Sequence, residues 1–343
     1  MGRGLVKFDG TRWTVYNTSN SSLPSDRIYV IAIDKQGNKW IGTEKGLVKF
    51  DGTRWVVYNT SKSGLPDNYV RAIAIDRQGN KWIATSSGKV ARFDGMRWAV
   101  YNVTSFNLYA IAIDGLDNKW LGTSGEGLVK YDGATRVVYN TSNSDLPNNI
   151  VKAIAIDGQG NKWVGTYNGV AKFDGMRWTV YNTSNSELPD DEVNAIAIDE
   201  QGSKWIGTKR GLAKFDDTMW TVYNTSNSGL PDNRVYAIVI DRQGNKWIGT
   251  LGGLAKFDDT KWTVYNISNS GLPSNIVITI AIDGQGNKWI GTNGGLAKFD
   301  GTSWVVYNVS NSGLPDNIVL AITIDKQGSK WIGTSGGGVA VLR

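Results

Sequence analysis

The sequence predicts an all-β chain built from many small antiparallel sheets, and three observations lead to that fold class. A segment of the form Lys-Trp-(Ile/Leu/Val)-(Gly/Ala)-Thr occurs eight times. Each copy stands among short runs of alternating apolar and polar residues, a pattern typical of strands. The connections contain Asp-Gly and Gln-Gly pairs, which favour tight turns. Together these observations predict an eight-bladed β-propeller of four-stranded antiparallel blades.

The repeat has a nearly constant length. Most successive tryptophans of the repeated segment are 42 residues apart, so eight repeats account for nearly all of the 343 residues. These tryptophans are Trp40, Trp82, Trp120, Trp163, Trp205, Trp247, Trp289 and Trp331. We therefore expect residues 1–343 to form a single propeller domain, with no linker and no second domain.

Each repeat contains four segments with strand character, which the sixth copy illustrates. Residues 235–241 alternate and are rich in β-branched side chains, and they are followed by 246–250, 253–258 and 262–266. Short Asp-x-Gln-Gly and Asp-Gly turns join antiparallel neighbours. The remaining connection is long, polar and contains proline, so we expect it to cross to the next blade.

The two ends of the chain predict how the last blade is completed. The sequence begins with a third and a fourth strand, 4–8 and 13–17, and ends with a third-strand-like segment at 338–342. We predict that the N-terminal strand completes the last blade and protects its edge. Which of 4–8 and 338–342 takes the third position stays open. The other would lie on the surface or pair with a second molecule, so a monomer is favoured and a strand-mediated dimer is the alternative.

The repeats also carry a family resemblance. Their pattern is V-x-A-I-A-I-D-x-Q-G-N-K-W-I-G-T-x-x-G-L-x-K-F-D, and it resembles the two-component regulator propeller repeat over essentially the whole chain. The resemblance implies the sensor region of bacterial regulators, which is often periplasmic or extracellular and often responds to carbohydrates. The N-terminus shows no signal peptide and no apolar run of about 18 residues occurs, so we expect no membrane segment and the compartment stays open.

Composition limits the chemistry that the chain can perform. Cysteine and histidine are both absent. Their absence excludes disulfides, thiolate or imidazole metal sites and every mechanism in which histidine acts as base. The turn aspartates are expected to be solvated, and a wide ring of them does not bring several oxygens to one point, as a hard cation requires. We therefore expect no cofactor, no metal site and no enzymatic activity.

The net charge of +6 does not indicate a nucleic-acid partner. In each repeat two basic residues and two aspartates occupy constant places, so their charges cancel around the fold. The remaining charges are scattered among the loops. A nucleic-acid surface would need basic residues gathered on one face.

Two registers vary among otherwise similar repeats: the second residue of the first strand, and the residue that follows the second-strand threonine. Both approach one mouth of the predicted channel, where residues of mixed polarity suit a polar ligand or a partner loop. Relaxed constraint on exposed residues would produce the same variation. The candidate binding residues are Tyr29, Glu44, Arg71, Phe106, Tyr109, Lys152, Tyr167, Asn194, Lys209, Arg210 and Tyr236.

The third repeat departs most from the pattern. The connection that precedes its first strand is five residues shorter than in the other copies, and Arg136 occupies the register that holds tryptophan elsewhere. Phe106 is expected to replace the anchoring leucine of the missing Gly-Leu-Pro, with contact to a ligand as the alternative. We therefore expect the break in symmetry beside Arg71, Phe106 and Tyr109 to be the leading candidate for the ligand site.

Three functions remain open on this basis. The leading hypothesis is a non-enzymatic bacterial sensor-type propeller that binds a small polar or carbohydrate ligand, or a protein partner, at the channel mouth. The second is a highly symmetric amplified or engineered repeat scaffold with no dedicated ligand. A glycan-active enzyme ranks third, because no asymmetric acid and base cluster can be recognised.

Overall fold

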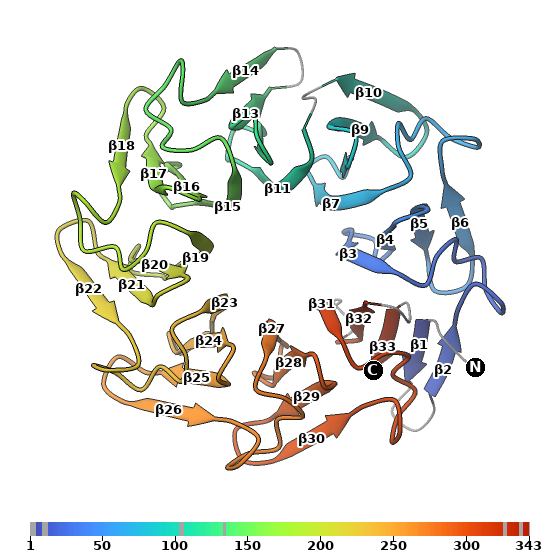
Figure 1. Ribbon diagram of the computed structural model, residues 1–343. Helices are drawn as coiled ribbons and strands as arrows, with labels where there is room; N and C mark the ends of the chain where they lie inside the picture. The colour runs from blue at the N-terminus through green and yellow to red at the C-terminus, as the bar shows by residue number, and fades with distance from the viewer. Residues whose placement is uncertain are drawn as a thin grey trace. The chain divides into compact units, whose positions relative to one another are not determined.

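The structure is a computed structural model that describes residues 5–8, 13–102, 106–132, 135–324, 328–335 and 339–342. Every regular element in these ranges is a β-strand (Figure 1). The described residues include no helix long and apolar enough to cross a membrane. The chain divides into two compact units: unit 1 is Met1–Asn102 with Ile267–Arg343, and unit 2 is Val103–Asn266. That residues 1–343 act as one domain stays a prediction.

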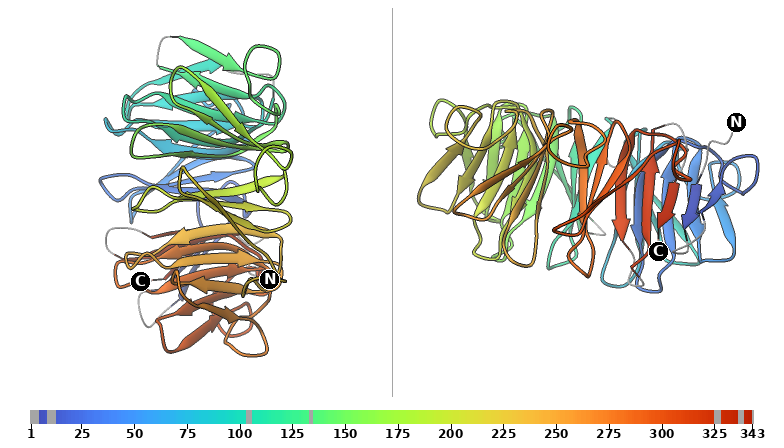
Figure 2. Two further views of the ribbon diagram at one scale, coloured as in Figure 1. Left: turned by 90° about the vertical axis from the view of Figure 1, so that its left-hand side faces the viewer. Right: turned by 90° about the horizontal axis from the view of Figure 1, so that it is seen from below.

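Unit 2 contains four sheets, each of four antiparallel strands in sequence order. The strands of the first two sheets are β11 (Leu108–Ile113), β12 (Lys119–Thr123), β13 (Leu128–Tyr131), β14 (Arg136–Tyr139), β15 (Val151–Ile156), β16 (Lys162–Thr166), β17 (Gly169–Phe173) and β18 (Trp178–Tyr181). Those of the other two are β19 (Val193–Ile198), β20 (Lys204–Thr208), β21 (Leu212–Phe215), β22 (Trp220–Tyr223), β23 (Val235–Ile240), β24 (Lys246–Thr250), β25 (Leu254–Phe257) and β26 (Trp262–Tyr265). In side view the strands of each sheet lie next to one another (Figure 2).

Unit 1 contains three further sheets of this kind and one larger sheet. The four-stranded sheets consist of β3 (Ile28–Ile33), β4 (Lys39–Thr43), β5 (Gly46–Phe50) and β6 (Trp55–Tyr58); β7 (Val70–Ile75), β8 (Lys81–Thr85), β9 (Lys89–Phe93) and β10 (Trp98–Asn102); and β27 (Val277–Ile282), β28 (Lys288–Thr292), β29 (Leu296–Phe299) and β30 (Trp304–Tyr307). The larger sheet contains β1 (Leu5–Phe8), β2 (Trp13–Tyr16), β31 (Val319–Ile324), β32 (Lys330–Thr334) and β33 (Val339–Leu342).

The prediction of eight four-stranded antiparallel blades is wrong. Within the described ranges the fold is an all-β propeller with seven blades of four antiparallel strands, and the remaining strands form a five-stranded sheet in the order β2-β1-β33-β32-β31. In that sheet β1 pairs with β33 in parallel, whereas the other blades are antiparallel throughout. The physical reason is that both segments that compete for the third position are used. Strand β33 pairs with β32, and β1 then covers the hydrogen-bonding edge of β33 and brings β2 with it.

Each blade begins with a bulged strand. In β11 the pairing passes from Leu108 opposite Thr123 to Ala110 opposite Gly122, so Tyr109 has no direct partner. The same shift at the second residue occurs in β3, β7, β15, β19, β23, β27 and β31. A bulge leaves one residue outside the ladder and redirects its side chain. The first of the two variable registers is therefore the bulge position.

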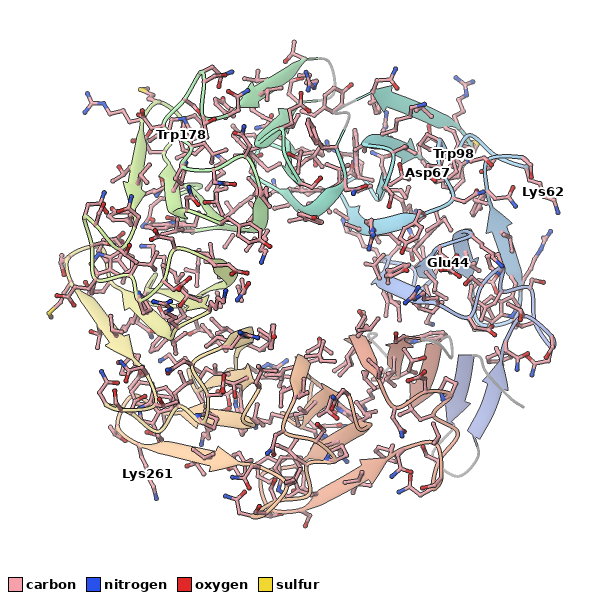
Figure 3. The ribbon with its side chains drawn as sticks, in the orientation of Figure 1. Glu44, Lys62, Asp67, Trp98, Trp178 and Lys261 are labelled. Carbon is pink, nitrogen blue, oxygen red and sulfur yellow. The ribbon has the colours of Figure 1, made fainter. Side chains whose placement is uncertain are left out.

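Neighbouring blades within a unit are held together by the second-strand tryptophans. Trp163 of β16 is fully buried and packs against Tyr181 of its own blade, with ring centroids 6.1 Å apart. It also meets Phe215 of the next blade at 6.0 Å. The fourth-strand tryptophans from Trp55 onward are only half-buried: Trp178, on the outer strand β18 (Figure 3), stacks on Phe173 at 4.6 Å. The second-strand tryptophans therefore form part of the core.

The aspartates that follow the first strands belong to the same packing and are buried rather than solvated, whereas those that follow the third strands, such as Asp51 and Asp174, are exposed as expected. Asp157 accepts hydrogen bonds from Trp163 Nε1 at 3.0 Å and from the Asn161 side chain at 2.8 Å. Burial alone would raise the pKa of Asp157, but these hydrogen bonds outweigh it and hold the pKa below its ordinary value. Lys204 of the next blade places its ammonium 4.8 Å from the Trp163 ring centroid. Lysine, tryptophan and aspartate thus recur in each repeat for structural reasons.

Candidate binding site

The candidate residues lie at the end of the blades where the first strands begin and the second strands end. Unit 1 carries Tyr29, Glu44 and Arg71, and Figure 3 shows Glu44 over the β3–β6 sheet. Unit 2 carries the other candidate residues, so the two groups are described separately. In each unit the structure brings candidate residues into contact, and it adds loop residues that the sequence reasoning did not single out.

In unit 1 the bulge residues Tyr29 and Arg71 of two adjacent blades form a tyrosine–arginine cluster with Tyr69, which directly precedes β7. The rings of Tyr29 and Tyr69 stack with centroids 4.9 Å apart, and their hydroxyls share a hydrogen bond. The Arg71 guanidinium lies 4.3 Å from the Tyr69 centroid and 5.1 Å from that of Tyr29. Its Nε donates to Ser86 Oγ at 3.2 Å, which fixes the guanidinium plane. Burial, with the hydrogen bond to Tyr69, raises the pKa of Tyr29 to about 12, so the Tyr29 hydroxyl stays protonated near neutral pH.

Glu44 stands beside this cluster and links two loops of its own blade. It accepts a hydrogen bond from Ser25 Oγ at 3.1 Å and pairs with Arg27 at 3.8 Å. Glu44 and Arg27 line a shallow cavity of about 360 Å³ together with Lys45 and Ser335. The cavity is therefore lined by acidic, basic and hydroxyl side chains.

In unit 2 a lysine–glutamate cluster joins Lys152, Tyr167, Glu192, Asn194 and Lys209. Lys152 Nζ lies 2.8 Å from Glu192 Oε1 and 3.2 Å from Asn194 Oδ1, and it sits 4.1 Å from the Tyr167 ring centroid. Lys209 approaches the other oxygen of Glu192 at 3.5 Å. The hydrogen bond from Lys152 lowers the pKa of Glu192. Burial alone would lower the pKa of Lys152, but Glu192 and Tyr167 raise it, so the pair is ionised.

Arg210 borders this cluster and is largely exposed. Its Nε lies 3.2 Å from Asp190 Oδ2, an ion pair at the protein surface. Arg210 and Asp190 line a shallow cavity of about 370 Å³ with Tyr167, Glu192 and Lys209. Five of the candidate residues of unit 2 (Tyr167, Lys209 and Arg210 around the cavity, Lys152 and Asn194 beside it) are thus brought together. Tyr236 is a bulge residue that is 39% exposed and outside this cluster.

The shortened loop of the third repeat places its aromatic residues differently from the prediction. The anchoring leucines of the neighbouring repeats, Leu65 and Leu146, are 3% and 2% exposed, whereas Phe106 is 44% exposed. Phe106 therefore does not take their buried position. Its ring lies against Gly125, where an added Cβ would come within 2.8 Å of the ring. Tyr109, at the bulge, is 49% exposed. The loop presents two aromatic rings at the surface of unit 2.

The sequence reasoning missed the residue that directly precedes each first strand. Tyr69 and Glu192 hold this position in the second and fifth repeats, and each is the centre of its cluster. The register varies as freely as the two others: Arg27, Tyr69, Asn107, Ile150, Glu192, Arg234, Ile276 and Ile318. Comparing the repeats one residue further upstream would have found it.

The carboxylates in and beside the two clusters are engaged by neighbouring side chains. Among the described residues no group of three or more acidic side chains could hold a metal ion. The carboxylates of Glu44 and Glu192 are each held by a basic residue and a further donor or cation. What the arrangement offers is hydrogen-bond donors, acceptors and ring faces at a surface.

Comparison with known proteins identifies the repeat. Five segments match the family model of the two component regulator propeller, which confirms the resemblance, at residues 22–45, 64–87, 145–168, 229–252 and 271–294. No curated protein matches the sequence.

Three solved structures illustrate the likeness of fold. The extracellular domain of a protein described as a hybrid two component system from B. thetaiotaomicron is 22% identical, with a TM-score of 0.60 over 96% of this chain and 57% of that one. The computationally designed protein Ika8 is 14% identical, with a TM-score of 0.71 over 99% of both chains. Streptogramin B lyase is 16% identical, with a TM-score of 0.60 over 84% of this chain and 96% of the lyase. At such identities the likeness concerns the fold.

Proposed function

We propose, on the premise that the chain is built from two component regulator propeller repeats, that it is a non-enzymatic sensor-type propeller. It binds a small polar or carbohydrate ligand, or a loop of a partner protein, at the channel mouth. The observation that carries the proposal is the bulge at the second residue of each first strand. A bulge frees a side chain from the sheet without disturbing the framework, so this position can vary while the blade is kept.

The chemistry of the two clusters supports a ligand rich in hydroxyls. The tyrosine–arginine cluster offers stacked ring faces, which pack against the C–H faces of a sugar, beside guanidinium donors. The lysine–glutamate cluster offers ammonium donors and carboxylate acceptors within one surface. A hydroxyl group both donates and accepts hydrogen bonds. A ligand rich in hydroxyls therefore fits a surface of mixed donors and acceptors better than a purely anionic or cationic ligand does.

Binding without catalysis is supported by the protonation states. A general acid in hydrolysis needs a carboxyl whose pKa is raised toward neutrality. Lys152 instead lowers the pKa of Glu192, and the raised pKa of Tyr29 prevents it from acting as a base near pH 7. With no histidine or cysteine in the chain, the clusters lack the groups that most acid, base or nucleophilic mechanisms use.

A thermal-shift screen tests the proposal. The purified chain is heated with a panel of oligosaccharides, sugar acids and polar metabolites, and a ligand that binds the native state raises the melting temperature. Arg71→Ala and Lys152→Ala should each reduce the shift caused by a ligand of their own unit. Arg97→Ala and Arg177→Ala, exposed on the outer turns, are the matched controls and should leave it unchanged. A ligand whose shift survives every mouth substitution would disprove the placement, and hydrolysis of a glycan by the purified chain would disprove the absence of catalysis.

The second candidate is a symmetric scaffold without a dedicated ligand, and the near-identity of the repeats favours it. The third strands β21, β25 and β29 have the same sequence, Leu-Ala-Lys-Phe. This hypothesis predicts no shift with any compound of the panel. It also predicts that the mouth substitutions change the melting temperature no more than the outer-turn controls do.

A further inference from the structure

A cavity of unit 2 lies at the end of the blades opposite the candidate site. It has a volume of about 620 Å³ and lies between the sheet β11–β14 and the sheet β15–β18, which are neighbours (Figure 1). Its walls carry the aromatic side chains of Trp120, Tyr139 and Phe173 and the lysines Lys130 and Lys162. Cavities of roughly 300 to 1,000 Å³ with apolar walls and few polar groups are typical of small-molecule sites.

The cavity is lined by glycine at three places of this pair of repeats. At the first two places most other repeats carry longer side chains, and at the third place aspartate replaces glycine in two repeats. Gly115 and Gly158 follow the turn aspartates, and Gly175 follows the aspartate after the third strand. A Cβ added at Gly158 or Gly175 would meet nothing within 4 Å. No other successive pair of repeats has glycine at all three places. The counterparts elsewhere include Lys35, Arg77, Glu200 and Arg242 at the first register and Asp217 and Asp259 at the second.

The missing side chain at Gly175 changes the surroundings of Lys162. In the next two blades the equivalent lysines form close ion pairs: Lys204 with Asp217 at 2.5 Å and Lys246 with Asp259 at 2.6 Å. Lys162 has only the Asp114 carboxylate, at 3.5 Å. Lys162 therefore lacks the close carboxylate that Lys204 and Lys246 contact, and it resembles Lys81, whose nearest described carboxylate is Asp34 at 3.6 Å.

The carboxylates that line the cavity are already held by other donors. Asp114 accepts hydrogen bonds from Trp120 Nε1 at 2.9 Å and from the Asn118 side chain at 2.9 Å. Asp174 accepts from the backbone N–H groups of its own turn, at 2.7 and 2.8 Å. Lys130 stands 5.8 Å from the Trp120 ring centroid and forms no ion pair with any described residue. The ammonium groups of Lys130 and Lys162 are thus the charged groups with capacity left for a ligand.

We propose that this cavity binds a small organic carboxylate with an apolar or aromatic body. The ligand carboxylate takes the place beside Lys162 that the Asp217 carboxylate takes beside Lys204, and its body lies against Tyr139 and Phe173. The inference does not depend on the function proposed for the channel mouth. The candidate residue Tyr109 is the second residue of β11, and the cavity residue Asp114 directly follows this strand. Five residues of extended chain, or roughly 17 Å, therefore separate the two sites.

Fluorine NMR with 4-fluorobenzoate tests the proposal. The probe signal should broaden with the unmodified chain, and the neutral 4-fluorobenzyl alcohol should bind at least tenfold more weakly because it lacks the carboxylate. Gly175→Asp supplies the missing carboxylate from the protein and should weaken binding of the probe at least tenfold. The backbone accepts this change, since Asp217 and Asp259 adopt positive φ angles of 77° and 72° where Gly175 has 108°.

Two further variants keep the test decisive. Gly95→Asp makes the same change in the second repeat of unit 1 and should leave probe binding unchanged, and Lys162→Met should weaken it at least tenfold. The melting temperature of each variant shows that it is folded. Failure of 4-fluorobenzoate to bind, equal binding of the alcohol, or equal binding to a folded Gly175→Asp variant would each overturn the proposal.

Discussion

Replacing Trp163 by phenylalanine should destabilise unit 2 mainly through one buried hydrogen bond. The phenyl ring can still stack on Tyr181 and Phe215, but it has no donor for Asp157, which is 7% exposed. A hydrogen bond to a charged group contributes about 1.5 to 3 kcal/mol. The smaller ring leaves a cavity that costs about 1 kcal/mol more. We therefore expect Trp163→Phe to lower the free energy of unfolding by about 2.5 to 4 kcal/mol.

Trp178→Phe is the matched control for this change. Trp178 is half-buried, stacks on Phe173 in the same repeat, and its Nε1 donates to no described residue. We expect its replacement to cost about 1 kcal/mol or less, because the lost ring edge is partly solvated. Urea unfolding followed by circular dichroism measures both variants, with the slope of the transition checked so that the free energies are comparable. Equal losses in the two variants would refute the reasoning.

The pH dependence gives a second check on the same hydrogen bond. The pKa of Asp157 is held below its ordinary value of 3.8 in the folded chain, with the hydrogen bond from Trp163 offsetting the effect of burial. The stabilisation is therefore fully present above the unfolded pKa and is lost as the pH falls through the folded value. The difference between Trp163→Phe and the unmodified chain should shrink from pH 7 to about pH 3. A difference that is constant over this range would show that lost packing, not the hydrogen bond, causes the effect.

Two further predictions concern backbone packing and the mouth. Gly165→Ala should lower the free energy of unfolding by about 1 to 3 kcal/mol, because an added Cβ would lie 2.6 Å from Val193 Cγ1 of the next blade. Gly158→Ala is the control. A Cβ at Gly158 would have no atom within 4 Å, so this change should be close to neutral in the same urea experiment. Lys152→Ala should raise the pKa of Glu192, because it removes the hydrogen bond that lowers it. A carbon-13 NMR titration of the glutamate carboxyls measures this shift, and an unchanged midpoint would contradict the ion pair.

Most of the regular structure was predictable because its signals are local. The strand pattern predicts β23 over 235–241, and the strand is Val235–Ile240. The recurrence of tryptophan predicts buried core, and Trp163 is fully buried. Alternation along a strand and turn dipeptides act over a few residues, so sequence alone reveals them.

The last sheet was predicted only in part, because its pairing joins the two ends of the chain. The sequence leaves 4–8 and 338–342 as competitors for one place, and the structure contains both, as the parallel neighbours β1 and β33. Strand pairing depends on which edges meet after the rest of the unit has folded. A pattern read along the chain carries no information about that choice.

The candidate residues show the same division between local and tertiary information. Comparison of the repeats indicated Tyr29, Arg71 and Lys152 because they vary within a constant frame, and the frame itself follows from the sequence. The bulge that frees these side chains was decided by pairing. So were the partners of Tyr29 and Lys152, which are Tyr69 and Glu192 of the respective next blades.

The sequence by itself thus determined the repeat, the strands and the core tryptophans of this protein. Tertiary structure decided the five-stranded sheet, the exposure of Phe106, the burial of the aspartates that follow the first strands and the cavity beside Lys162. The physical reason is that a side chain's direction follows from its own strand, whereas its neighbour and its access to water follow from the blade packed against it.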